Sequence, residues 1–136
     1  MAARNDAVRI LVADDCDQLR AGLCSLLEAR QGWIVCGEAR NGLEAIERAV
    51  KLKPDVILMD MSMPHLSGFD AAKRIHEQLP DSEILIVTEH DSRTLAHFPR
   101  QPGVRGYVRK GYLKADLISA IEAASSHRPL SASASV

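Results

Sequence analysis

The stretch Val56-Ile-Leu-Met-Asp60 decides how this chain folds, because four apolar residues run directly into an acidic one. An uninterrupted apolar run of this length is typical of a strand that is buried on both faces, as in the centre of a parallel sheet. Pro54 precedes the run and Pro64 follows it. We therefore predict a central strand over residues 56–59 that ends on Asp60.

Four other segments have the composition of strands. They cover residues 8–13, 33–39, 84–87 and a stretch that contains 106–108. Segment 33–39 is less uniformly apolar than the others, which predicts an edge strand. Its alternation predicts one face carrying Trp33, Val35, Gly37 and Ala39.

Apolar residues at helical spacing lie between these strands. The stripes consist of Leu19, Leu23, Leu26 and Leu27; of Leu43, Ile46 and Val50; of Phe69, Ala72, Ile75 and Leu79; and of Leu113, Leu117, Ile118 and Ile121. One further helix is expected within residues 91–103, where Pro99 and Pro102 lie. A proline inside a helix costs about 3 kcal/mol, so we expect this helix to be short or irregular and to end near Phe98.

Strict alternation of strand and helix predicts an α/β fold, since right-handed crossovers place helices on both faces of a parallel sheet. Five strands fit the doubly wound order 2-1-3-4-5 of a flavodoxin-like three-layer sandwich. Such sheets bind ligands at the carboxyl ends of strands 1 and 3. We expect one domain over residues 1–124 and a flexible Ser/Ala-rich tail over 125–136.

Composition excludes several classes of function. The chain has 136 residues and a net charge of −1, without a strong cluster of basic residues, which argues against nucleic acid as a ligand. No apolar run approaches the roughly 20 residues of a membrane-spanning helix, and residues 1–6 lack the apolar core of a signal peptide. We therefore expect a cytoplasmic protein that does not bind membranes.

Polar residues follow the inner strands at the point where each strand ends. Asp14 and Asp15 follow the first strand, Asp60 the third, Thr88 the fourth and Lys110 the fifth. Parallel strands place all of these ends at one edge of the sheet. Three neighbouring carboxylates repel one another unless a cation compensates them, and their hard oxygen atoms favour Mg²⁺. The backbone carbonyl of Ser62 could add a fourth ligand.

This set of residues suits phosphoryl transfer. A carboxylate such as that of Asp60 can attack a phosphoryl group and form an acyl phosphate. Positive charge nearby stabilises the transferring group, and Mg²⁺ and Lys110 would supply it. The hydroxyl of Thr88 could donate a hydrogen bond to the attached phosphoryl group.

The same residues resemble the receiver domain of bacterial response regulators. The matching stretches are Val8-Arg-Ile-Leu-Val-Ala-Asp14-Asp15, Pro54-Asp-Val-Ile-Leu-Met-Asp60-Met-Ser-Met-Pro64, Ile86-Val-Thr88 and Gly106-Tyr-Val-Arg-Lys110. The resemblance extends over residues 8–124. The loop 60–68 and the pair Gly106-Tyr107 are most similar to the NarL/LuxR-type branch of two-component signalling proteins.

The resemblance implies a role for each matching residue. Asp60 would accept phosphate from the phosphohistidine of a histidine kinase, and Asp14 and Asp15 would bind Mg²⁺. Lys110 would contact the phosphoryl group, while Thr88 and Tyr107 would form the switch pair. The chain would catalyse only its own phosphorylation and dephosphorylation, and would not be an enzyme in the ordinary sense.

In such receivers the output face consists of the fourth helix, the fifth strand and the fifth helix. The resemblance therefore implies an unknown partner protein on that face. Homodimerisation that depends on phosphorylation is left open by the sequence. So is the choice between a stand-alone receiver and a piece of a longer regulator.

Three residues depart from the family's usual pattern. Glu89 follows Thr88 where a small residue is common, and we expect it to point outward. His90 lies where the family tunes the lifetime of the aspartyl phosphate. Gly111 follows Lys110 where many relatives have proline, which leaves the isomer of that peptide bond open.

Two other functions remain as alternatives. The chain could be an interaction module of the same fold that no longer responds to phosphate, as Glu89 and the proline-rich fourth helix suggest. It could also be a phosphatase, because Asp15-Cys16-Asp17 loosely resembles the nucleophile motif of haloacid-dehalogenase-type enzymes. Dependence of catalysis on Asp15 rather than Asp60 would favour the phosphatase.

Overall fold

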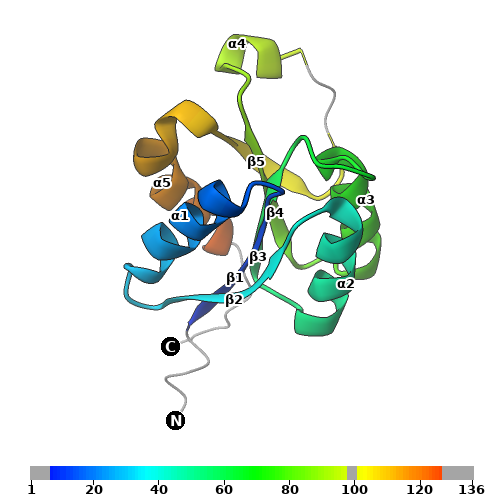
Figure 1. Cartoon of the computed structure of the whole chain (residues 1–136), viewed down its shortest axis with the longest axis horizontal. Coiled ribbons are helices and arrows are strands. Elements are labelled where there is room, and N and C mark those ends of the chain that lie inside the picture. Colours follow the sequence, from blue (N-terminus) through cyan, green and yellow to red (C-terminus); the bar gives the residue numbers. More distant parts are fainter. Residues whose placement is uncertain (1–6, 98–100, 127–136) are drawn as a thin grey trace.

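Five parallel strands form one sheet in the order β2-β1-β3-β4-β5, which confirms the predicted doubly wound α/β fold (Figure 1). This computed structural model describes residues 7–97 and 101–126, and the side chains of 92 and 112–115 are not considered. The strands are β1 (Val8–Ala13), β2 (Trp33–Ala39), β3 (Val56–Asp60), β4 (Glu83–Thr88) and β5 (Val104–Arg109). The predicted central and edge strands are β3 and β2.

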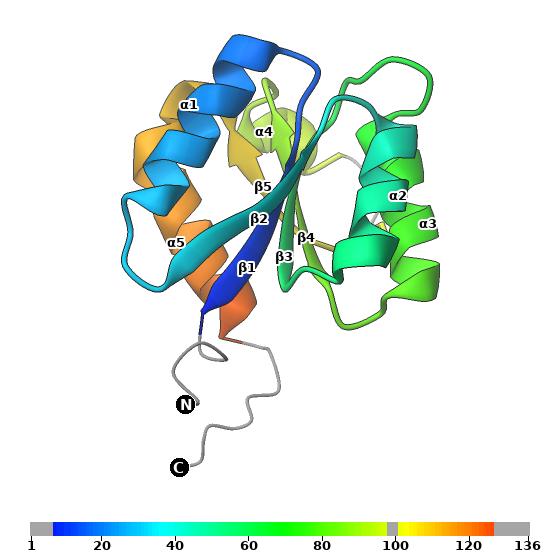
Figure 2. The same cartoon turned by 60° about the horizontal axis from the view of Figure 1, so that its bottom comes forward.

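Helices cover both faces of the sheet. They are α1 (Asp17–Glu28), α2 (Gly42–Leu52), α3 (Gly68–Gln78), α4 (Ser92–Leu95) and α5 (Leu113–Ser125), and the short 3₁₀ helix η2 (Lys110–Tyr112) precedes α5. Figure 2 shows α1 and α5 on one face and α2 and α3 on the other. Across the described ranges, we find no helix with the length and apolar character that a membrane crossing requires.

The central strand β3 supplies both cores, because successive side chains point to opposite faces. Val56 and Leu58 pack toward α1 and α5, whereas Ile57 and Met59 pack toward α2 and α3. All five residues of β3 are buried. This rigid, doubly covered strand holds Asp60 at its carboxyl end.

The predicted single face of β2 is wrong, because a bulge divides the strand. Ile10 of β1 pairs with Val35, but the next residue, Leu11, pairs with Gly37, so Cys36 is the extra residue. Val35 therefore packs toward α1 and α5. A Cβ atom on Gly37 would instead meet Leu52 of α2. Alternation in the sequence cannot reveal a bulge, since the extra residue reverses the facing of every residue after it.

Helix α2 forms as predicted, but its buried face differs from its most apolar stripe. Leu43 and Val50 are 52% and 37% exposed, and the buried residues of the helix are Gly42, Ala45 and Ala49. A Cβ atom on Gly42 would lie 2.5 Å from the carbonyl oxygen of Leu66. The backbone of α2 lies so close to its neighbours that only small side chains fit between them.

Helix α4 is short, as the prolines predicted. It spans four residues and ends at Leu95, beyond the carboxyl end of β4 (Figure 1). Pro102 lies in the turn that leads into β5, while Phe98 and Pro99 fall outside the described residues. The predicted tail begins within the last residues of α5, and its part from 127 onward also falls outside them.

Candidate functional site

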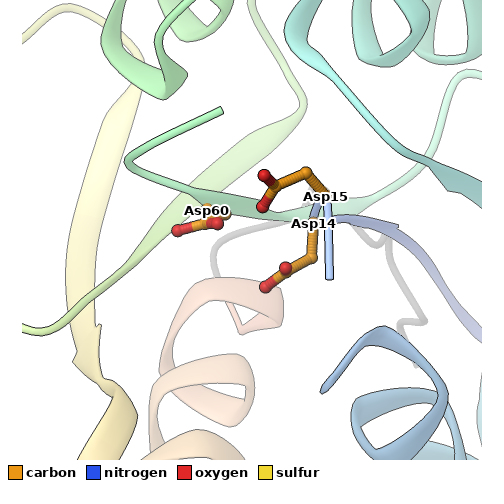
Figure 3. Close-up of side chains that lie close together, drawn as sticks. All are labelled: Asp14, Asp15 and Asp60. Atoms are coloured by element: carbon orange, nitrogen blue, oxygen red, sulfur yellow. The ribbon is translucent and has the colours of Figure 1, made fainter. Parts of the chain in front are cut away.

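Three carboxylates gather at the carboxyl edge of the sheet, where β1 and β3 end. Asp14, Asp15 and Asp60 each offer an oxygen atom, and these atoms lie within 4.8 Å of one another (Figure 3). Asp14 and Asp60 are 1% and 2% exposed, whereas Asp15 is exposed. The acidic cluster predicted from the sequence therefore forms in the folded chain.

The register of the sheet explains why these residues meet. β1 lies beside β3, and Ala13 pairs with Met59, so Asp14 and Asp60 are the next residues along two neighbouring parallel strands. The crossover connections leave β1 and β3 in opposite directions, which opens the carboxyl edge at this point. Side chains separated by more than 40 positions in the sequence are thus neighbours.

Hydrogen bonds hold the two buried carboxylates in place. The backbone N–H of Cys16 donates to Oδ1 of Asp14 at 2.9 Å, and the N–H of Ser62 donates to Oδ1 of Asp60 at 3.3 Å. The Nζ atom of Lys110 lies 3.2 Å from the same oxygen of Asp60. Lys110 follows β5, so three strands contribute to this small volume, as predicted.

Burial and the neighbouring negative charges disfavour the ionised forms of Asp14 and Asp60. Burial and the neighbouring carboxylate of Asp14 raise the pKa of Asp60 to about 6, although Lys110 and the N–H of Ser62 oppose this shift. Burial also raises the pKa of Asp14, against the N–H of Cys16 and Lys110. Burial disfavours the charged form of Lys110, but Asp60 and Asp14 outweigh it and raise its pKa.

The donor set fits a divalent cation. Oδ2 of Asp14 is buried and has no hydrogen-bond partner among the described residues. An unpaired buried acceptor is destabilising, and a bound cation would remove this cost. The single charge of Lys110 cannot balance three carboxylates. Hard carboxylate oxygens with room for water and phosphate are the ligands that Mg²⁺ prefers. An acidic cluster that could bind a metal is thus present, as the sequence predicted.

The raised pKa of Asp60 predicts a pH dependence of stability in the metal-free protein. Asp60 should be protonated in the folded state up to about pH 6, but its ordinary pKa is 3.8. Its contribution to stability is therefore full below pH 3.8 and is lost as the pH rises through 6, a change of about 3 kcal/mol in all and of about 2 kcal/mol between pH 4.5 and 7.5. Urea unfolding of the wild type and Asp60→Asn at pH 4.5 and 7.5 measures it. A stability difference between the two proteins that is equal at both pH values would contradict this prediction.

The predicted switch residues lie in different surroundings. Thr88 is 1% exposed, and its hydroxyl donates to the sulfur of Met61 at 3.6 Å and accepts from the N–H of His90 at 3.1 Å. Tyr107 is half-buried, and its ring packs edge-to-face against Phe69 of α3, with ring centres 6.3 Å apart. Thr88 thus ends the strand beside that of Asp60, and Tyr107 lies on β5 in contact with α3.

The residues that depart from the family pattern do not close the site. Glu89 and His90 are both exposed, as expected for Glu89. Glu89 lies near enough to Lys110 to favour the charged form of that lysine and so contributes to its raised pKa. The peptide bond between Lys110 and Gly111 is trans, because the described residues contain no cis bond.

The sequence reasoning missed Arg20, which binds the acidic loop formed by residues Asp14 to Cys16. Its guanidinium donates to the backbone oxygen of Asp14, to Asp17 and to Glu38. The spacing of Asp17 and Arg20 fits an ion pair on α1, although the sequence analysis drew no inference from it. It carried no sign of the contact with Asp14, which depends on the angle at which α1 leaves the sheet.

Comparison with known proteins agrees with the fold and shows the family. A family model described as the response regulator receiver domain matches residues 10–122. The transcriptional regulatory protein LiaR of Bacillus subtilis is 37% identical over 122 residues, which cover 90% of this chain and 58% of LiaR. The response regulator GacA of Pseudomonas viridiflava is 36% identical over 114 residues, which cover 84% of this chain and 53% of GacA. The chain spans little more than half the length of these curated relatives.

Solved structures show the same likeness. A two-component response regulator of the LuxR family from Aurantimonas sp. SI85-9A1 superposes with a TM-score of 0.82 at 34% identity, covering 90% of this chain and 87% of that one. The signal receiver domain of the putative response regulator NarL from Mycobacterium tuberculosis gives 0.81 at 28% identity, covering 90% and 99%. Strand order, strand-end carboxylates and the match over residues 10–122 agree, and the chain belongs to the response regulator receiver domains of two-component signal transduction, with relatives on the NarL/LuxR-type branch.

Proposed function

We propose that this chain is a phosphorylation switch whose Asp60 accepts a phosphoryl group from the phosphohistidine of a histidine kinase. The observation that carries the proposal is the position of Asp60. Its carboxylate lies within 4.8 Å of the carboxylate oxygens of Asp14 and Asp15 and 3.2 Å from the Nζ atom of Lys110. A nucleophile, a site for a cation and a second positive charge thus occupy one pocket.

The contacts of Asp60 indicate which of its oxygens attacks. Lys110 and the N–H of Ser62 both hold Oδ1, which leaves Oδ2 to form the bond to phosphorus. The bond between phosphorus and the donor's imidazole nitrogen breaks, and the imidazole then takes up a proton. Asp14, Asp15, Asp60 and the carbonyl of Ser62 would hold Mg²⁺, which when bound neutralises charge on the phosphoryl oxygens.

Thr88 and Tyr107 would couple phosphorylation of Asp60 to a conformational change at the protein surface. A thioether is a weak acceptor, so the Thr88 hydroxyl can leave Met61 for a phosphoryl oxygen at little cost. The half-buried ring of Tyr107 can then repack against α3, starting from its contact with Phe69. The output face would consist mainly of β5 and α5, since α4 spans only four residues. A cytoplasmic location and homodimerisation on phosphorylation belong to this proposal.

One alternative keeps some support. The four-residue α4 is compatible with an interaction module that binds its partner regardless of phosphate. The exposed position of Glu89 weakens this alternative, because an acid that points outward does not block the pocket. The phosphatase alternative is weaker still, because Asp17 of its motif lies in the first turn of α1 and pairs with Arg20.

Intact-mass spectrometry tests the proposal. Incubation with acetyl phosphate and Mg²⁺ should add one phosphoryl group per chain, and EDTA should prevent the gain, because the carboxylate cluster repels the donor without a cation. Phosphorylation of the same chain by a histidine kinase would then identify the natural donor class. A chain that stays unmodified with acetyl phosphate and Mg²⁺ would support the phosphate-independent module instead.

A further inference from the structure

Arg20 reaches from α1 to the end of β1 and the edge strand β2. Its Nη1 donates to the backbone oxygen of Asp14 at 2.8 Å, and its Nε donates to Oε1 of Glu38 at 2.9 Å. Its Nη2 donates to Oδ1 of Asp17 at 2.7 Å. The side chain is only 12% exposed although it is charged. One guanidinium group thus fastens the first turn of α1 and the edge strand to the residue that begins the acidic loop.

The contact with Asp14 matters because this residue is buried. Asp14 is 1% exposed, and a buried carbonyl without a donor is destabilising. Three other hydrogen bonds anchor the loop from Asp14 to Cys16: the N–H of Asp14 donates to the carbonyl of Ala39, the N–H of Cys16 donates to the carboxylate of Asp14, and the backbone N–H of Arg20 donates to the carbonyl of Cys16. Arg20 therefore fixes the backbone carbonyl at the start of this loop.

The planar fork of arginine suits this task. Its nitrogen atoms point in fixed directions, so three acceptors on three segments are held at once, whereas a lysine offers a flexible point charge. Asp17 and Glu38 form ion pairs with Arg20, and the charge of Arg20 affects the pKa of Asp14 less than the charges of Lys110 and Asp15 do. Arg20 is thus arranged to set geometry rather than to supply charge.

We infer that Arg20 is a positioning residue for the divalent cation, which holds the Asp14–Asp15 turn so that both carboxylates face Asp60. The inference rests on the proposed function, since it concerns the Mg²⁺ site of that function. Groups that orient metal ligands from behind commonly change metal affinity by 10- to 100-fold when they are lost. Arg20 acts through the backbone of Asp14 and does not itself touch the cation or the phosphoryl group.

The test must separate position from charge. Removing a positive charge near the acids would by itself favour a cation, whereas loosening the turn would weaken its binding. Arg20→Lys keeps the charge and removes the fork, so it isolates the geometric effect. Arg48→Lys is the matched control, because Arg48 donates to the carbonyl of Glu38 on the same edge strand but does not contact Asp14.

Titration of the metal-free proteins with Mg²⁺, followed by the backbone amide resonances of Cys16 and Ser62, gives the dissociation constants. The amide spectrum also shows that each variant is folded, so a loss of stability alone does not affect the result. Arg20→Lys should bind Mg²⁺ about tenfold more weakly than the wild type, while Arg48→Lys should match the wild type. Equal affinity of folded Arg20→Lys and the wild type would overturn the inference.

A second variant covers the case in which Arg20→Lys does not fold. The side chain of Glu38 is 50% exposed, so Glu38→Gln is tolerated while it replaces the ion pair with Arg20 by a weaker, uncharged hydrogen bond. It should weaken Mg²⁺ binding about threefold, because an exposed ion pair changes an equilibrium constant by only a small factor. Glu44→Gln should leave Mg²⁺ binding unchanged. Unchanged affinity in Glu38→Gln would count against the inference. A wild type that binds no Mg²⁺ would instead overturn the proposed function.

Discussion

Asp60→Asn should abolish phosphorylation of this chain by acetyl phosphate, with a loss in rate of about a thousandfold or more, as is usual when a nucleophile is removed. An amide oxygen is a far weaker nucleophile than a carboxylate and cannot form a stable acyl phosphate. The side chain keeps its shape, so it still accepts hydrogen bonds from Lys110 and the N–H of Ser62. The variant also removes one of the two buried carboxylates, and at pH 7 it should unfold at a higher urea concentration than the wild type.

Intact-mass spectrometry after a timed incubation measures this effect, and peptide mapping locates the modified residue. Asp55→Asn is a matched control, since Asp55 precedes the same strand at its opposite end and accepts a hydrogen bond from the N–H of Arg9. The control should gain phosphate as the wild type does. A phosphate gain in Asp60→Asn at the wild-type rate would show that another residue is the acceptor.

Gly68→Ala should destabilise the chain by about 3 kcal/mol, at the upper end for an overpacked core. Gly68 begins α3, and its N–H donates to the carbonyl of Met61 at 2.9 Å. An added Cβ atom would overlap the carbonyl oxygen of Asp60 and lie 3.0 Å from the Cα atom of Met61. These atoms belong to the backbone and cannot rotate away, so the loop after β3 must move.

The same displacement should slow phosphorylation, because the loop positions Asp60 and the carbonyl of Ser62. Urea unfolding and the rate of mass gain measure the two effects separately. Gly22→Ala is the control: a Cβ atom there has no neighbour within 4 Å in the described structure, and alanine stabilises a helix interior by about 0.5–1 kcal/mol. Wild-type stability and rate in Gly68→Ala would show that the loop accommodates the methyl group freely.

The sequence alone determined the order of the elements and the composition of the acidic site. The run that ends on Asp60 is apolar throughout, and only a strand covered on both faces tolerates such a run. Once the sheet is parallel and doubly wound, its topology brings the ends of β1, β3 and β5 together. Asp14, Asp15, Asp60 and Lys110 could therefore be assigned to one pocket from their places after these strands.

The tertiary structure decided what depends on distance and packing angle. The bulge at Cys36 reverses one face of β2, and the close approach of α2 buries its small residues in place of Leu43 and Val50. The brace from Arg20 to Asp14 exists only because α1 packs beside β1 and β2 at one particular angle. The raised pKa of Asp60 has the same origin, because burial and repulsion depend on separations in space that a linear pattern does not contain.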